Sequence, residues 1–126
     1  MAKIVVYEDG YMDLIDRYAH LTKEHDIHVR HPTHHIEFER PERYRQHGFN
    51  PDNFKAFGNP KEDDADLYFL DGLRGLCFQF ATELPKDKTF IYSDSREIED
   101  EARKIGLNVV GYRRIEVIVK ETLEKK

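Results

Sequence analysis

The chain has 126 residues, close to the common size of one globular domain and enough to bury a single core. Charged residues make up 36% of it, well above the roughly 25% of an average globular protein, which indicates a strongly solvated surface. The formal net charge is -5, which argues against a general nucleic-acid binder, since such proteins carry a basic surface.

A single cysteine, Cys77, excludes an internal disulfide, and its apolar neighbours predict a buried thiol. No apolar run approaches the roughly 18 residues that a membrane-spanning helix needs. We therefore expect one cytoplasmic domain over residues 1–126 that has no contact with a membrane.

The first elements follow from short hydrophobic patterns. Residues 3–7 are almost continuously apolar, as in a strand covered on both faces, and an acidic turn follows them. Apolar residues then recur at helical spacing over 12–25, and 27–31 is typical of a second strand that ends at Pro32.

The segment 32–64 has no clear periodicity and is broken up by proline and glycine. The pair Asn50-Pro51 predicts the start of a brief helix over 52–57. We expect Phe49, Phe54 and Phe57 to pack this irregular segment onto the core, because a structureless loop of this length is uncommon in a compact domain.

The second half alternates between strand and helix patterns. In chain order these patterns cover residues 66–71, 73–84, 89–92, 98–105, 107–112 and 115–125. Asp94 with Glu97 forms a capping box before the second of these helices, and Gly106 suits its end. Residues 115–119 also alternate with the period of a strand, but the tail that follows favours a helix.

Strands that alternate with helices predict a doubly wound, mostly parallel sheet with helices on both faces. We therefore expect a five-stranded, flavodoxin-like α/β domain of three layers. In such a sheet the ligand site lies beyond the carboxyl ends of the strands, where the strand order reverses.

Acidic residues occur at those strand ends. Glu8 and Asp9 follow the first strand and Asp71 follows the third, so three carboxylates converge if these strands are neighbours. Such a group repels itself unless it is protonated or bridged by a cation, and Mg²⁺ is the natural ion because it prefers oxygen ligands. Ser93 and Arg113 follow later strands and could hold an anion beside that metal.

These residues resemble the site of the receiver domains of bacterial response regulators, including the chemotaxis regulators. The resemblance covers most of the chain apart from about residues 32–64. It implies that Glu8 and Asp9 bind Mg²⁺, that Asp71 accepts a phosphoryl group, and that Ser93 and Arg113 contact that group. It further implies a stand-alone signalling or regulatory domain whose partners are a kinase and a target protein.

The sequence departs from that family at several places, two of which concern the predicted site. Asp71 runs directly into Gly72-Leu73 where the family has a longer loop, and Arg113 stands where the family has a lysine. Arginine keeps the charge, but it is planar and larger than an ammonium group.

Two other functions remain open on the same acidic edge. The carboxylates with Mg²⁺ could hydrolyse phosphoesters, with Asp71 as nucleophile or metal ligand and Arg113 stabilising charge. Alternatively, the domain binds another protein without being phosphorylated, because a fold does not fix a function. The sequence also leaves open a homodimer through the last helix.

Two further groups of residues are candidate sites. Six histidines lie between residues 25 and 47 and could bind a transition metal, but they lack a recognised ligand spacing, and a polar surface loop is the favoured interpretation. Arg40, Arg43 and Arg45 surround Tyr44 and could contact an acidic partner, although nearby glutamates favour a solvated face with ion pairs.

Overall fold

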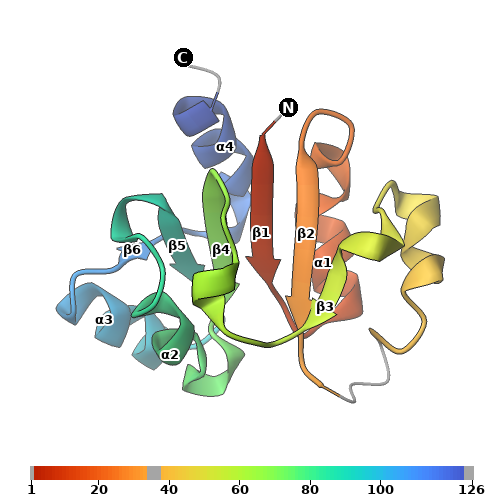
Figure 1. The fold of residues 1–126 in the computed structure, drawn as a ribbon. Helices are drawn as coiled ribbons and strands as arrows, with labels where there is room; N and C mark the ends of the chain where they lie inside the picture. Colours follow the sequence, from red (N-terminus) through yellow and green to blue (C-terminus); the bar gives the residue numbers. More distant parts are fainter. Residues whose placement is uncertain (1, 34–37, 124–126) are drawn as a thin grey trace.

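The computed structural model describes residues 2–33 and 38–123. Six parallel strands form one sheet in the order β3-β2-β1-β4-β5-β6 (Figure 1). The strands are β1 (Lys3–Tyr7), β2 (Asp26–His31), β3 (Phe54–Ala56), β4 (Leu67–Asp71), β5 (Thr89–Tyr92) and β6 (Asn108–Val109). The predicted doubly wound, flavodoxin-like α/β fold is confirmed.

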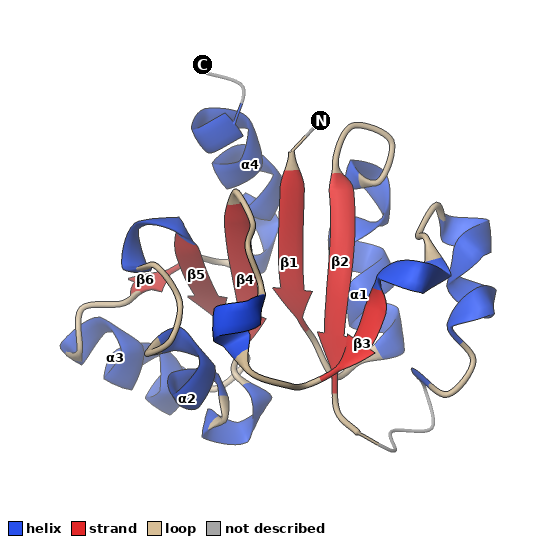
Figure 2. Ribbon diagram, in the orientation of Figure 1, coloured by secondary structure: helices blue, strands red, loops and turns tan. Residues whose placement is uncertain are grey.

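Helices cover both faces of the sheet. They are α1 (Tyr11–Tyr18), α2 (Cys77–Ala81), α3 (Arg96–Lys104) and α4 (Ile115–Leu123). In the view of Figure 2, α2 and α3 lie in front of the sheet and α1 and α4 lie behind it. No helix in the described part of the chain has both the length and the apolar character needed to cross a membrane.

The apolar run of β1 supplies both cores, which is why it shows no alternation. Ile4 and Val6 belong to the core behind the sheet, with residues of α1 and α4. Val5 and Tyr7 belong to the core in front, with residues of α2 and α3. Successive side chains of a strand point to opposite faces, so a central parallel strand must be apolar at every position.

The sixth strand, β3, is the main correction to the predicted fold. The helix expected over 52–57 is instead a 3₁₀ turn, Pro51–Asn53, followed directly by β3. The helical turn does begin at the predicted pair Asn50-Pro51, because the Asn50 side chain accepts a hydrogen bond from the Asp52 N–H at 3.0 Å. Pairing of Phe54 beside Val29 at the sheet edge then outweighs the local helix preference.

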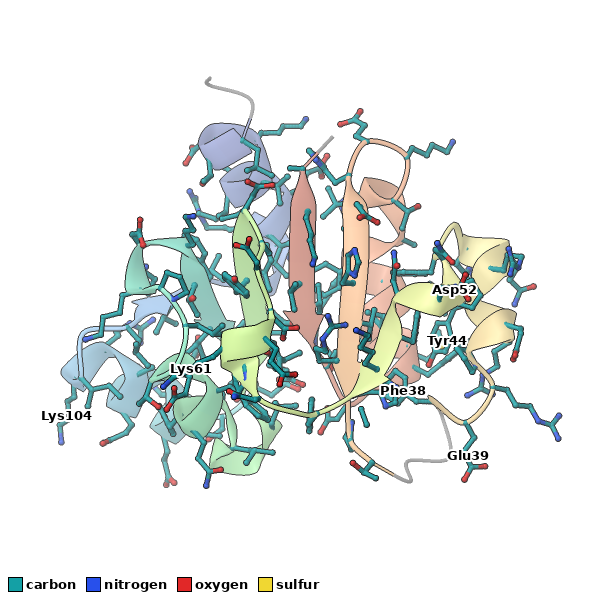
Figure 3. All side chains as sticks on the ribbon, viewed as in Figure 1. Phe38, Glu39, Tyr44, Asp52, Lys61 and Lys104 are labelled. Carbon is teal, nitrogen blue, oxygen red and sulfur yellow. The ribbon has the colours of Figure 1, made fainter. Side chains whose placement is uncertain are left out.

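Aromatic packing holds the irregular segment against the back of the sheet. The rings of Phe38, Tyr44, Phe49 and Phe54 contact one another, and the centroids of Tyr44 and Phe54 are 4.8 Å apart. Tyr44 is completely buried, so it belongs to the core and not to a surface patch for an acidic partner. Figure 3 shows the labelled Phe38 and Tyr44 beside β3.

Two predicted helices are shorter than their patterns. The helix expected over 73–84 breaks into a 3₁₀ turn, Leu73–Gly75, and α2, because Leu73 and Gly75 take positive φ values of 50° and 96°. The helix expected over 12–25 ends at Tyr18, and a 3₁₀ turn continues to Leu21. Most of the predicted apolar positions are nevertheless buried, namely Leu73, Cys77, Phe80, Ala81 and Leu84.

The last third of the chain follows the predicted order. The cap of α3 is Ser95 and not Asp94, since the Ser95 hydroxyl accepts from the Ile98 N–H at 3.4 Å. Gly106 has the predicted left-handed conformation after that helix, with a φ of 82°. The segment from residue 115 forms a helix, as predicted. The strand expected over 107–112 is shorter than predicted and consists of the two residues of β6.

Candidate functional site at the acidic edge

The strand order reverses between β1 and β4, where the chain has wound first to one side and then to the other. Tyr7 lies beside Leu70 in register, so Glu8, which follows β1, and Asp71, the last residue of β4, lie side by side. Asp71 in turn lies beside Tyr92, which brings Ser93 to the same edge. Parallel sheets bind their ligands at such a position.

Three carboxylates gather at this edge. Glu8, Asp9 and Asp71 each offer one oxygen, and these three oxygens lie within 4.8 Å of one another. Glu8 is fully buried, whereas Asp9 and Asp71 are half-buried and reach solvent. The donor set contains only carboxylate oxygen, which suits a hard cation such as Mg²⁺.

Four hydrogen bonds hold the Glu8 carboxylate in place. Its Oε1 accepts from the N–H groups of Asp9 and Gly10 at 3.0 and 3.3 Å. Its Oε2 accepts from Arg17 at 2.9 Å and from the Tyr92 hydroxyl at 3.0 Å. A carboxylate offers about four lone-pair positions, so these donors occupy most of the acceptor capacity of Glu8.

A buried chain of hydroxyl groups continues from Glu8 into the core behind the sheet. The Tyr18 hydroxyl donates to the Tyr92 hydroxyl at 2.5 Å, and Tyr92 donates to Glu8. The Arg17 guanidinium lies over the Tyr92 ring at 4.9 Å and also pairs with Asp13 at 3.4 Å. Arg17 of helix α1 and Tyr92 of strand β5 thus hold the Glu8 carboxylate in place, and Arg17 supplies its counter-charge.

Burial and mutual repulsion govern the protonation of this group. Burial raises the pKa of Glu8 above its usual value, and the neighbouring Asp71 raises it further, while Arg17 and Tyr92 oppose the shift. Burial also raises the pKa of Asp71. Without a cation, the Glu8–Asp71 pair therefore holds on to a proton at a higher pH than two exposed carboxyl groups would.

The surroundings of Asp71 are tightly packed. Asp71 Oδ1 accepts from the Gly72 N–H at 2.7 Å. Gly72 has no room for a side chain, because an added Cβ would come within 2.5 Å of the Ser93 hydroxyl oxygen. Ser93 therefore lies next to the residue that follows Asp71, and its hydroxyl accepts from the Ser95 N–H at 3.0 Å.

Arg113 lies in a 3₁₀ turn, Tyr112–Arg114, after β6. Its side chain is exposed and lines a cavity of about 440 Å³ between α1 and α4, together with Arg17 and Glu116. The structure gives Arg113 no contact with Asp71 or Ser93. Arg17, whose guanidinium is paired with Glu8, is the cation at the acidic edge.

The other candidate groups do not form a second metal site among the described residues. His28 pairs with Asp26 at 2.8 Å, His31 stacks on Phe38, and His25 is buried. His34 and His35 lie outside the described residues. Burial raises the pKa of Cys77 to about 11, so the predicted buried thiol is a poor nucleophile at neutral pH.

Sequence patterns did not reveal the residues that support the site. Tyr18 and Tyr92 occupy core positions of a helix and a strand, where an aromatic residue is expected whether or not its hydroxyl has a partner. Arg17 follows Asp13 at the spacing of an ordinary helix-surface ion pair. Only the packing of α1 against β1 and β5 makes these residues the partners of Glu8.

Comparison with protein-family models, with curated proteins and with solved structures found no match to this chain.

Proposed function

We propose that the chain is a receiver-like regulatory domain that accepts a phosphoryl group on Asp71 with the help of a divalent cation. The observation that carries this proposal is the gathering of carboxylate oxygens from Glu8, Asp9 and Asp71 within 4.8 Å at the reversal of strand order. Asp71 is the member best suited to react, because it is partly open to solvent and one of its oxygens is fixed by Gly72.

The three acids would then divide their roles. Asp9 and Asp71 are the residues to hold the cation, since the Glu8 oxygens already accept four hydrogen bonds. Glu8 positions the turn that carries Asp9, through the N–H groups of Asp9 and Gly10. Arg17 and Tyr92 keep Glu8 in that position, so they act as positioning residues.

The reaction follows from this arrangement. The second oxygen of the Asp71 carboxylate, Oδ2, attacks the phosphorus of a phosphodonor, an acyl phosphate bond forms, and the bond to the leaving oxygen breaks. Asp9 and Asp71 would hold Mg²⁺ at this edge, and the ion would supply charge neutralisation for the incoming phosphoryl group. The Ser93 hydroxyl, beside Gly72, is the described side chain available to donate a hydrogen bond to that group. The donor would be a kinase, and a second protein would read the change at the surface.

The direct test is an amide NMR spectrum of the full chain with Mg²⁺, recorded before and after addition of beryllofluoride, which mimics a phosphorylated aspartate. We expect shifts centred on Asp9, Asp71 and Ser93, and none in Asp71→Asn. The exposed Asp87 at the other end of β5 provides the matched variant, Asp87→Asn, which should respond like the unaltered chain.

Two outcomes would contradict this proposal and favour another function. An unchanged spectrum would leave a domain that binds a partner without phosphorylation. Repeated turnover of a phosphoester such as p-nitrophenyl phosphate, lost in Asp71→Asn, would assign the same edge to a hydrolase. A receiver-like domain instead consumes its donor slowly and becomes labelled itself.

A further inference from the structure

The strand that ends in Asp71 is followed by a segment with an unusual backbone. Leu73 has a φ of 50°, and it is the only non-glycine residue with a positive φ in the described part of the chain. This left-handed conformation brings the Cβ of an L-residue too close to the following carbonyl oxygen. Such positions persist where the surrounding structure holds them, and they cluster at functional sites. The strained residue here lies next but one to the proposed phosphoacceptor.

The same segment interrupts a helix that the sequence pattern predicts. Apolar residues recur at helical spacing over 73–84, but α2 has only five residues. Gly72 and Leu76, on either side of the break, already have right-handed helical angles, with φ values of -58° and -63°. The left-handed Leu73 and Gly75, whose φ is 96°, therefore separate the observed form from a single longer helix.

The break is in direct contact with the acidic edge. The Gly72 N–H donates to Asp71 Oδ1 at 2.7 Å. Gly72 also packs against Ser93, whose hydroxyl oxygen would lie 2.5 Å from an added Cβ. Leu73 is 9% exposed and belongs to the core in front of the sheet, so its side chain anchors the strained form. A change at Asp71 therefore reaches the backbone of Gly72 and Leu73 directly.

The broken and the continuous form differ in how they interact with negative charge. The first N–H groups of a helix have no partner within the helix, and its start carries a partial positive charge. A helix that began at Leu73 would present that start to Asp71. A phosphoryl group on Asp71 adds negative charge and acceptor oxygens, so it stabilises the longer helix more than the broken one. A ligand needs such a difference in order to shift an equilibrium between two forms.

We propose that residues 73–75 form a switch that converts to a helical turn when Asp71 is phosphorylated. In the unphosphorylated chain Leu73 and Gly75 are left-handed, whereas in the phosphorylated chain α2 begins at Leu73 and is longer by one turn. The inference rests on the proposed phosphorylation of Asp71 and adds the element that this reaction regulates. Helix α2 lies on the front of the sheet (Figure 2), where a target protein would read its greater length.

The first test is NMR of the full chain with Mg²⁺, before and after addition of beryllofluoride. The one-bond Cα–Hα coupling of Leu73 distinguishes a positive from a negative φ, and NOE contacts between residues three and four apart report the helix. We expect beryllofluoride to change the Leu73 coupling to that of a right-handed residue and to produce helical contacts across 72–77. The same measurements on α3 should not change.

A matched pair of glycine variants tests the direction of the switch. Gly75 and Gly106 both have positive φ values, 96° and 82°, and at either position an added Cβ would meet only open space. Alanine disfavours the left-handed conformation at both positions, but only residue 75 becomes helical in the other form, where alanine is preferred to glycine. Gly75→Ala should therefore bind beryllofluoride about tenfold more tightly than the unaltered chain. Gly106→Ala should bind it with unchanged affinity.

A second comparison, at Leu73 itself, separates backbone strain from packing. Leu73→Ala and Leu73→Gly both remove the buried leucine side chain, but only alanine retains the cost of the left-handed conformation. Without beryllofluoride, Leu73→Gly should therefore be the more stable of the two in urea. With beryllofluoride the order should reverse, and Leu73→Ala should bind it more tightly, because the helical form favours alanine.

The possible failures can be told apart. Beryllofluoride shifts at Asp71 and Ser93 with an unchanged Leu73 coupling would show that the site works and that the segment does not switch. Equal affinities of Gly75→Ala and Gly106→Ala would also overturn the inference, as would a Leu73→Ala variant at least as stable as Leu73→Gly without ligand. No response of the unaltered chain at Asp71 would instead refute the phosphoacceptor proposal, and this inference with it.

Discussion

The front face of this sheet has two halves, one lined by apolar side chains and the other by charged side chains. On the β4–β5 side, the strand residues that face forward are apolar, such as Leu70 and Ile91, and α2 and α3 cover them. On the β2–β3 side, the forward-facing residues are charged, such as Arg30 and Lys55, and no α-helix of the described chain covers them. One sheet thus serves as a core wall at one end and as the floor of a polar cavity at the other.

The difference follows from the connections between strands. The chain from β4 to β5 passes through α2, which brings an apolar face onto the front of the sheet. The chain from β2 to β3 instead passes through the aromatic segment 38–54, which packs on the back. In the described chain no α-helix therefore packs on the front of β2, and polar side chains there avoid exposing a large apolar patch. The acidic edge lies on β1 and β4, where the two halves meet.

The largest expected contrast is in stability. Leu70→Ala removes a fully buried side chain from the covered half and should lower the free energy of unfolding by roughly 2–5 kcal/mol. Lys55→Ala, on the uncovered half, should change it by less than about 0.5 kcal/mol, since exposed positions carry little packing. Urea denaturation measures both, and equal losses would contradict the division into two halves.

The uncovered half should depend on one buried ion pair. Asp63→Asn keeps the size of the side chain but removes the counter-charge of the buried Arg30 guanidinium, so we expect a loss of roughly 2 kcal/mol. Asp64→Asn, the exposed neighbour, is the control and should be nearly neutral. The same urea measurement applies, and a neutral Asp63→Asn would show that solvent screens the pair.

At the acidic edge, where the two halves of the sheet meet, protonation should make the free energy of unfolding fall as pH rises. The folded chain raises the pKa of Glu8 and Asp71, while in the unfolded chain both titrate near about pH 4. Above that pH the unfolded chain binds fewer protons than the folded chain, so deprotonation favours unfolding by up to about 1.4 kcal/mol per pH unit for one retained proton. Unfolding curves across pH 5–8 should show this slope for the unaltered chain.

Asp71→Asn is the variant that isolates this effect, because it removes the repulsion within the pair. Its slope should be smaller than that of the unaltered chain, and Mg²⁺ should reduce the slope of the unaltered chain by replacing the proton. Identical slopes with and without Asp71 would show that other groups control the pH dependence.

A smaller effect is expected from the hydroxyl chain behind the acidic edge. Tyr92→Phe keeps the buried ring but removes the donor to Glu8 and the acceptor for Tyr18, which should lower stability by about 1 kcal/mol. If Glu8 positions Asp9, the same variant should also weaken Mg²⁺ binding, measured by calorimetry. Tyr68→Phe, which removes a buried hydroxyl at the other end of β4, is the control and should leave Mg²⁺ binding unchanged.

Much of the sheet could be predicted from the sequence because buried parallel strands are apolar at every position. The runs at 3–7, 66–71 and 89–92 gave three central strands, and the alternation with helices gave their parallel order. The parallel order in turn predicts that Glu8 and Asp71 lie close together, since parallel strands end at a common edge. These inferences depend only on local patterns and on a general rule of topology.

The parts that were missed depend on contacts between distant segments. β3 has three residues and forms only because Phe54 lies beside Val29 and packs on Tyr44. The partners of Glu8 come from α1 and β5, and no spacing in the sequence connects Arg17 with Tyr92. The charged residues that line the cavity in front of β2 and β3 likewise come from strands and turns that only the folded chain brings together.

The most direct test of the proposed function is the intact mass of the chain after incubation with acetyl phosphate and Mg²⁺. Phosphorylation of Asp71 predicts a product heavier by one phosphoryl group in the unaltered chain and in Asp87→Asn. That product should be missing from Asp71→Asn and from samples that contain EDTA. An unchanged mass in every sample, or the same increase in Asp71→Asn, would contradict the assignment of Asp71 as the phosphoacceptor.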